Sequence, residues 1–136
     1  MKSTLALALL FALLCIRCKS TQPVQEINTS VKEIIFGSGG GFTGVSSKKK
    51  LLINEKKLIW RDKVLNLKEE TIVDLTTKFD LDSMLNIQFT KPGNLTYSIT
   101  LTSGNKTNKI TWGKHNSPPP LIVSELYSFL TAISHE

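Results

Sequence analysis

Residues 95–102 read LTYSITLT, and this stretch indicates the fold class of the chain. Apolar residues occupy every second position, which is typical of a β-strand with one face on the core and the other in solvent. The next residues, 103–106 (SGNK), predict a tight turn. Residues 107–112 then return with Ile110 and Trp112 on the inner face. The sequence therefore predicts an antiparallel hairpin in the second half of the chain.

A second turn is predicted just before this hairpin, at residues 91–94, which read KPGN. Proline fixes φ at one central position of a turn, and glycine supplies positive φ at the next. We therefore expect Pro92 and Gly93 to reverse the chain, with positive φ at the glycine.

Further strands are predicted in the first half of the chain. Residues 31–36 (VKEIIF) are rich in β-branched and aromatic residues, and residues 42–46 can start a second strand. Short apolar pieces follow at 51–53, 58–60 and 64–67, separated by polar segments of turn length. This spacing predicts a meander of short antiparallel strands.

Helical periodicity replaces this alternation after the meander. Ile72, Leu75 and Phe79 are spaced as on one face of a helix, and acidic residues come first, where the helix dipole favours them. We expect a helix over about residues 68–78, followed by a turn at 80–82.

A last helix is predicted from residue 121 to about 134, after the stiff extended connector that ends in three prolines. The fold class that follows is α+β: an antiparallel sheet of short strands with two helices packed on one face. The predicted apolar face of the last helix consists of Ile122, Leu126, Phe129, Leu130 and Ile133.

The most unusual stretch is FGSGGGFTG at residues 36–44, which holds five of the eight glycines. Such a cluster serves backbone geometry, close approach of a ligand or partner, or mobility. The simplest interpretation is a wide turn or bulge between strands, and the alternative is a loop against which a ligand or partner lies. The candidate binding residues are Gly37, Ser38, Gly39, Gly40, Gly41, Phe42, Thr43 and Gly44.

The glycine spacing from Gly39 to Gly44 also matches the G-x-G-x-x-G pattern of dinucleotide-binding folds. That pattern must open a helix whose N-terminus faces the pyrophosphate. Residues 45–50 (VSSKKK) have no helical face, so nucleotide binding is not expected and no cofactor is predicted.

The positive charge of the chain is concentrated in residues 48–63, which contain seven basic and two acidic residues. A solvated hairpin face is the simplest interpretation, and attraction to an anionic membrane or polysaccharide surface is the functional one. Trp60 lies beside Arg61, as in many nucleic-acid binders. However, alternation predicts that Trp60 lies on the inner face with Leu58, so nucleic-acid binding is not expected.

Residues 1–18 predict a secretory signal peptide, because a charged start precedes a run of ten apolar residues (5–14), too few for a bilayer span of about 20. Cysteine at the end of such a segment suggests a bacterial lipoprotein. We expect acylation at Cys18, with Cys15 as the alternative. Residues 19–29 then form a polar tether, and residues 30–136 form a single α+β domain.

Neither catalysis nor a metal centre is predicted. His115 and His135 are the only histidines, and neither has the spacing of a metal-ligand set. No serine lies in a nucleophile elbow. The residues around the glycine stretch offer only hydroxyl groups, whereas acid–base catalysis needs titratable side chains.

Three stretches and the start of the mature chain resemble a group of small, uncharacterised bacterial envelope lipoproteins that carry an FGSGGGFTG-type glycine motif. These are residues 36–44, KPGN at 91–94, ITWG at 110–113, and Cys18 with the two residues after it. The group has no established activity, so the resemblance implies export and a lipid anchor but no catalytic residue.

Taken together, the sequence predicts a non-enzymatic envelope lipoprotein that binds a partner or has a structural role through its glycine loop. The alternative is a small envelope enzyme whose glycine loop holds a substrate. The expected partners are the membrane, through the lipid anchor, and either an envelope protein or an anionic surface.

Overall fold

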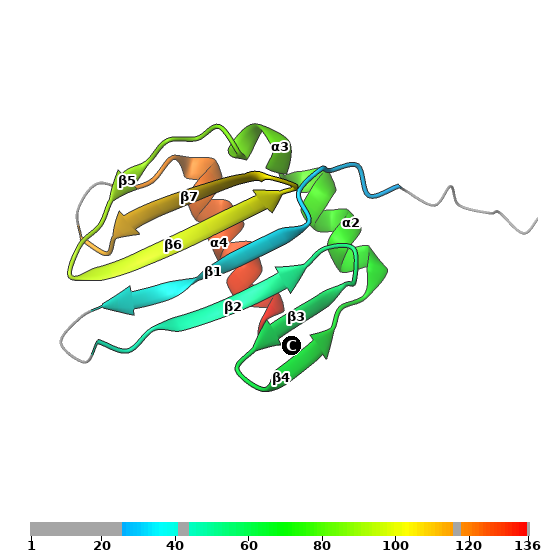
Figure 1. Ribbon diagram of the computed structural model, residues 1–136, viewed down its shortest axis with the longest axis horizontal. Coiled ribbons are helices and arrows are strands. Elements are labelled where there is room, and N and C mark those ends of the chain that lie inside the picture. Colours follow the sequence, from blue (N-terminus) through cyan, green and yellow to red (C-terminus); the bar gives the residue numbers. More distant parts are fainter. Residues whose placement is uncertain (1–25, 41–43, 116–117, 136) are drawn as a thin grey trace, which may run out of the picture.

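The computed structural model describes residues 26–40, 44–115 and 118–135. The predicted signal peptide, both cysteines, and Gly41, Phe42 and Thr43 lie outside these ranges. Within them the chain forms a seven-stranded sheet in the order β4-β3-β2-β1-β6-β7-β5, together with three helices (Figure 1). The α+β fold class is thus confirmed.

The elements follow the predicted order along the chain. The helices are α2 (Glu69–Lys78), α3 (Leu81–Met84) and α4 (Leu121–Ile133). The strands are β1 (Glu33–Gly40), β2 (Ser47–Leu52), β3 (Lys57–Trp60), β4 (Lys63–Asn66), β5 (Thr90–Lys91), β6 (Leu95–Ser103) and β7 (Lys106–Gly113).

The sheet is antiparallel except at one edge. Strand β1 lies in its middle and pairs antiparallel with β2 on one side and β6 on the other. The predicted hairpin is β6–β7, and the predicted meander is β2–β3–β4. Strand β5 pairs parallel with β7, which hairpin connections alone did not predict. The strands are also not uniformly short, because β6 has nine residues.

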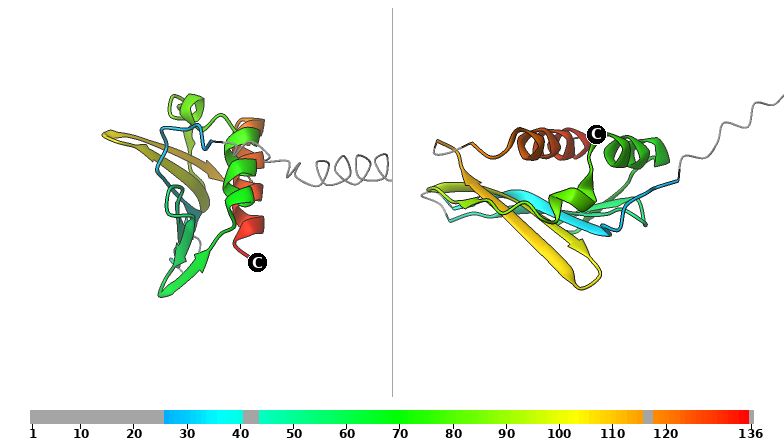
Figure 2. Two further views of the ribbon diagram at one scale, coloured as in Figure 1. Left: turned by 90° about the vertical axis from the view of Figure 1, so that its right-hand side faces the viewer. Right: turned by 90° about the horizontal axis from the view of Figure 1, so that it is seen from above.

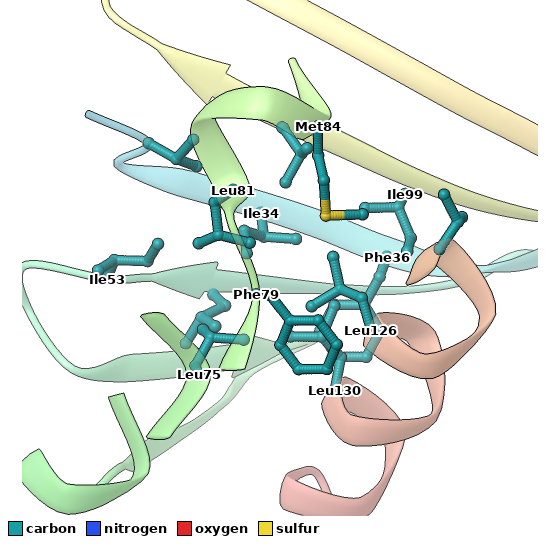
Figure 3. Close-up of a cluster of buried hydrophobic side chains, with 14 of the residues drawn as sticks. Ile34, Phe36, Ile53, Leu75, Phe79, Leu81, Met84, Ile99, Leu126 and Leu130 are labelled. Carbon is teal, nitrogen blue, oxygen red and sulfur yellow. The ribbon is translucent and has the colours of Figure 1, made fainter. Parts of the chain in front are cut away.

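Figure 2 shows α2 and α4 on the same side of the sheet, whereas the opposite face carries no helix among the described residues. The core fills the space between these two layers, as Figure 3 shows for its central side chains. Ile34 and Phe36 of β1 lie there with Ile99 of β6, and Leu126 and Leu130 of α4 pack onto them. Burial of such side chains is the main favourable contribution to folding.

The predicted apolar face of α4 is confirmed at Leu126, Leu130 and Ile133 but wrong at its other two residues. Val123 is completely buried, while Ile122 remains 36% exposed and Phe129 is only partly buried. Residues 122 and 123 are both apolar, so hydropathy alone leaves the rotation of the helix open by one position. In the folded protein, the packing of α4 against the sheet buries Val123 and leaves Ile122 at the surface.

The predicted turn at residues 80–82 is instead the short helix α3. The Asp80 carboxylate accepts two hydrogen bonds from Ser83, as an N-cap residue does. One comes from the Ser83 backbone N–H at 3.0 Å and the other from the Ser83 hydroxyl at 2.5 Å. These hydrogen bonds lower the pKa of the Asp80 carboxyl. Leu81 and Met84 bury their side chains beneath the helix. The capping residue was therefore mistaken for a turn residue.

The turn at residues 91–94 also differs from its prediction. Positive φ occurs at Gly37, Gly40, Gly44 and Gly104 among the described glycines, and Gly93 is not one of them. Instead, the Thr96 hydroxyl accepts from the Gly93 N–H at 3.2 Å and donates to the Gly93 carbonyl oxygen at 2.8 Å. A side chain from the following strand stabilises this turn.

Candidate functional site

The glycine stretch is mostly strand, so the prediction of a glycine loop is wrong for its first half. Strand β1 continues through Gly40, and Gly37 pairs with Lys48 on one side and Ser98 on the other. Neighbours on both sides hold the backbone in the sheet, which overrides the low strand propensity of glycine. The second predicted strand also begins later, at Ser47.

Two of these positions must be glycine, because the neighbouring backbone leaves no room for a Cβ atom. Gly37 has φ +153°, and a Cβ atom there would lie 1.8 Å from the Ser47 carbonyl oxygen. Gly40 has φ +92°, and its Cβ would lie 2.6 Å from the carbonyl oxygen of Asn94. Both distances are far below van der Waals contact, so any larger residue would push neighbouring strands apart.

The other described glycines are less constrained. A Cβ at Gly39 would lie 3.4 Å from the Ser46 hydroxyl, which is close but belongs to a side chain and not to the backbone. Gly44 has φ +63° and no atom within 4 Å of such a Cβ. The remaining candidates, Gly41, Phe42 and Thr43, lie outside the described residues.

A hollow lies beside this strand, between the C-terminal end of α4 and the β1–β4 part of the sheet. It consists of two adjoining cavities of about 500 and 290 Å³, which share Lys49, Trp60 and His135. We call this pair of cavities the basic groove. The larger cavity is completed by Leu58, Lys63, Val64, Leu65 and Ser134, and the smaller one by Phe36, Gly37, Ser38, Ser47, Tyr127 and Thr131.

Strand pairing places the charged residues of the groove in a row. Trp60 of β3 is directly opposite Lys63 of β4, and the β2–β3 register, continued by one position, brings Lys49 of β2 opposite Trp60. Residues opposite each other in antiparallel strands point to the same face, about 5 Å apart at Cβ. Lys49, Trp60 and Lys63 therefore form a row across three strands, which we call the Lys–Trp–Lys row.

Two cations lie close to the indole of Trp60. The Lys49 ammonium is 5.3 Å from the ring centroid, and the Arg61 guanidinium carbon is 5.1 Å from it. Both distances are within the range of a cation–π interaction. Trp60 shares the inner face with Leu58 as predicted, but it remains partly exposed at the groove, whereas Leu58 is buried.

Helix α4 contributes polar groups to the groove. The Lys49 ammonium donates a hydrogen bond to the Ser134 hydroxyl at 2.5 Å, which connects sheet and helix. Tyr127 packs edge-on against Trp112, with ring centroids 5.2 Å apart, and also contacts Tyr97. Burial, and secondarily the nearby Tyr97, raise the pKa of the Tyr127 phenol, so it stays neutral at physiological pH.

The basic segment divides into neutralised and unneutralised cations. Lys50, Lys56 and Lys57 each form an ion pair with a glutamate, at 3.1, 3.0 and 3.0 Å. Lys49 and Lys63 form no ion pair among the described residues. None of the described residues that line the groove is acidic. The positive charge that remains uncompensated therefore includes the two lysines of the groove.

These groups provide binding chemistry. Cations, an aromatic face and several hydroxyls line the groove, and together they suit a polar, anionic molecule with a ring. The described residues contain no cluster of three His, Cys, Asp or Glu side chains that could hold a metal ion. His115 is exposed on a loop, and His135, also exposed, lies at the groove.

The structure thus brings only part of the predicted site to the groove. Gly37 and Ser38 line the smaller cavity, while Gly39, Gly40 and Gly44 line neither cavity. Sequence reasoning included Lys49 and Lys63 only as members of the basic segment, and it missed Tyr127 and His135 as site residues. One signal for Lys49 was available: a lysine at an inward position of the alternating β2 strand.

No described helix is both long enough and apolar enough to cross a bilayer. Comparison of the sequence with models of protein families found no match, and comparison with curated proteins found no significant one.

Proposed function

We propose that this protein is an exported, lipid-anchored lipoprotein of the bacterial envelope, whose domain is a non-enzymatic binding module. We further propose that the basic groove is its binding site. The observation that carries this proposal is the division of the basic segment: outside the groove three of four lysines, all except Lys48, form ion pairs with glutamates, whereas neither lysine inside the groove does so among the described residues.

Electrostatics favour an anionic ligand in such a site. A cleft lined by charges of one sign focuses the electrostatic potential and raises the local concentration of counter-ions. Cavities of 300–1,000 Å³ are typical of small-ligand sites, and the larger cavity is about 500 Å³. An enzymatic use of the glycine stretch has no comparable support, because Gly37 and Gly40 already have a structural reason to be glycine.

The proposed anchor rests on the sequence before the domain. The chain has a charged start, a short apolar run and Cys18, followed by a polar segment. Ile27, within the predicted tether of residues 19–29, packs against the core. One acyl chain holds a protein only marginally, at about 0.8 kcal/mol per buried CH₂, whereas two or more hold it stably.

The anchor is tested by expressing the full chain in a bacterium that processes lipoproteins. We expect mass spectrometry of the mature protein to find an acylated N-terminal Cys18 and fractionation to recover the protein with membranes. Cys18→Ala should release it from the membranes, and Cys15→Ala should not. Membrane association that survives Cys18→Ala would refute the proposed anchor.

The binding role is tested with anionic probes of several kinds and the full-length protein in detergent. We expect at least one probe to bind saturably, and Lys63→Gln to weaken that binding. Lys57→Gln is the matched control, because it removes the same charge from the same segment but outside the groove. Equal loss in both variants would indicate a diffuse charge effect and no groove site.

A further inference from the structure

We propose that the ligand of the basic groove is an acidic saccharide, a sugar ring that carries a carboxylate or phosphate. This inference rests on the proposed binding function and adds the chemical class of the ligand. It is argued from the Lys–Trp–Lys row, from the hydroxyl groups opposite that row and from the size of the groove.

The row places the indole of Trp60 between two strands that each carry a lysine, Lys49 on β2 and Lys63 on β4. Sugar rings have a face of C–H groups that packs on an aromatic ring, whose π face carries partial negative charge. Lys49 lines both cavities and Lys63 the larger one, whereas Arg61 lines neither. Arg61 therefore contacts the indole from outside the groove. The two lysines line the cavities in which a sugar ring stacked on Trp60 would lie.

The acidic substituent follows from the charges of this row. A neutral sugar stacked on Trp60 would leave Lys49 and Lys63 without a counter-charge among the described residues. A carboxylate or phosphate on the ring would lie within reach of both ammonium groups, and hydrogen bonds between two charged groups are among the strongest in proteins. Charge complementarity thus selects an acidic saccharide over a neutral one.

The opposite side of the groove supplies partners for sugar hydroxyls. Ser38 of β1 and Thr131 of α4 line the smaller cavity with the phenol of Tyr127. The Thr131 hydroxyl already donates to the Tyr127 carbonyl oxygen at 2.8 Å and can only accept from a ligand, whereas the hydroxyls of Ser38 and Tyr127 can both donate and accept, as sugar hydroxyls also do. A bare anion such as phosphate needs only donors, so these groups favour a larger polar ligand.

Two other anionic ligands fit less well. An acidic peptide that bound as an added strand would need a free sheet edge, whereas the groove lies over the sheet face beside α4. An anionic lipid could place an acyl chain against Leu58, Val64 and Leu65 of the larger cavity, but it would leave the hydroxyls of the smaller cavity, which come from three elements, without partners. The acidic saccharide uses the aromatic ring, the cations and the hydroxyls together.

The inference is tested by titration calorimetry on the full-length protein in detergent at low salt. The probes are digalacturonate, the neutral disaccharide maltose, inorganic phosphate, hexaglutamate and vesicles containing phosphatidylglycerol. We expect digalacturonate to bind at least about tenfold more tightly than maltose and phosphate, and its affinity to fall as salt screens the lysines.

Variants locate the binding. Trp60→Ala should weaken digalacturonate binding at least about tenfold, because it removes the stacking surface. Lys63→Gln, at an exposed position that leaves the core intact, should weaken it several-fold, and Lys57→Gln should leave it unchanged. Melting temperatures identify any variant that is not folded.

Each remaining outcome overturns the inference in a distinct way. Equal binding of phosphate or hexaglutamate that does not depend on Trp60 would show a general anion site. Groove-dependent binding of the vesicles without digalacturonate binding would show a lipid ligand. In both cases the proposed binding function stands. If no probe binds, the acidic saccharide and the groove as a binding site are refuted together.

Discussion

The glycine stretch of β1 and the Lys–Trp–Lys row lie side by side in one sheet, but they have different roles: the glycines serve backbone packing, and the row lines a cavity. The glycines allow backbones to approach, since Gly37 and Gly40 lie against carbonyl oxygens of neighbouring segments. The row consists of common residues that strand pairing brings together at a cavity. The comparison teaches that an unusual sequence can be architectural, while a candidate binding site can be built from ordinary residues.

The largest effect that this comparison predicts is at Gly37. Gly37→Ala should lower the free energy of unfolding by about 3 kcal/mol or more, because Cβ would overlap the Ser47 carbonyl and φ is unfavourable for alanine. Urea unfolding measures this loss. Gly39→Ala is the matched control, two positions along the same strand, and should change stability by less than about 0.5 kcal/mol. Equal stability of both variants would contradict an architectural role for Gly37.

A smaller effect on stability is expected for Arg61→Gly, which should weaken ligand binding while it leaves the free energy of unfolding nearly unchanged. Arg61 has φ +54°, which costs about 1–2 kcal/mol for a residue with Cβ. Glycine relieves this strain, but it adds about 0.4–1 kcal/mol of unfolded-state entropy and removes a cation–π contact of about 0.5–1 kcal/mol. We expect stability to change by less than about 1 kcal/mol and digalacturonate affinity to fall several-fold. A large loss of stability with unchanged affinity would show that Arg61 serves the turn.

The smallest effect concerns alkaline pH and Tyr127. The folded-state pKa of this phenol is raised by burial, so its contribution to stability is fully present below the unfolded value of about 10 and is lost as pH rises through the folded pKa. Tyr127→Phe should therefore lose less stability above pH 10 than the parent does, as thermal melts at a series of pH values can measure. Identical alkaline profiles would argue against a perturbed phenol at the groove.

Much of the fold could be predicted from the sequence because its signals are local. The alternation in residues 95–102 became β6, and the spacing of Ile72, Leu75 and Phe79 identified α2 within one residue at its start. The predictions failed where the local sequence was compatible with two different structures. Asp80 suits a turn as well as an N-cap, and neighbouring apolar residues left the rotation of α4 undecided.

The candidate site was much less accessible to sequence reasoning. Glycine enrichment pointed to residues 36–44, but of the described members only Phe36, Gly37 and Ser38 line the groove. Lys49 and Lys63 lie 14 positions apart, and nothing in their local sequence distinguishes them from the paired lysines of the same segment. The difference depends on which lysines have a glutamate within reach.

By itself the sequence determined the α+β class, the hairpins, two of the helices and the concentration of positive charge in residues 48–63. These follow from periodicity, turn chemistry and composition, which act over a few residues. Only the tertiary structure decided that the glycines continue a central strand and that Lys49, Trp60 and Lys63 share one face beside α4. The physical reason is that register, ion pairing and cavities arise from contacts between segments distant in the chain, which local patterns do not encode.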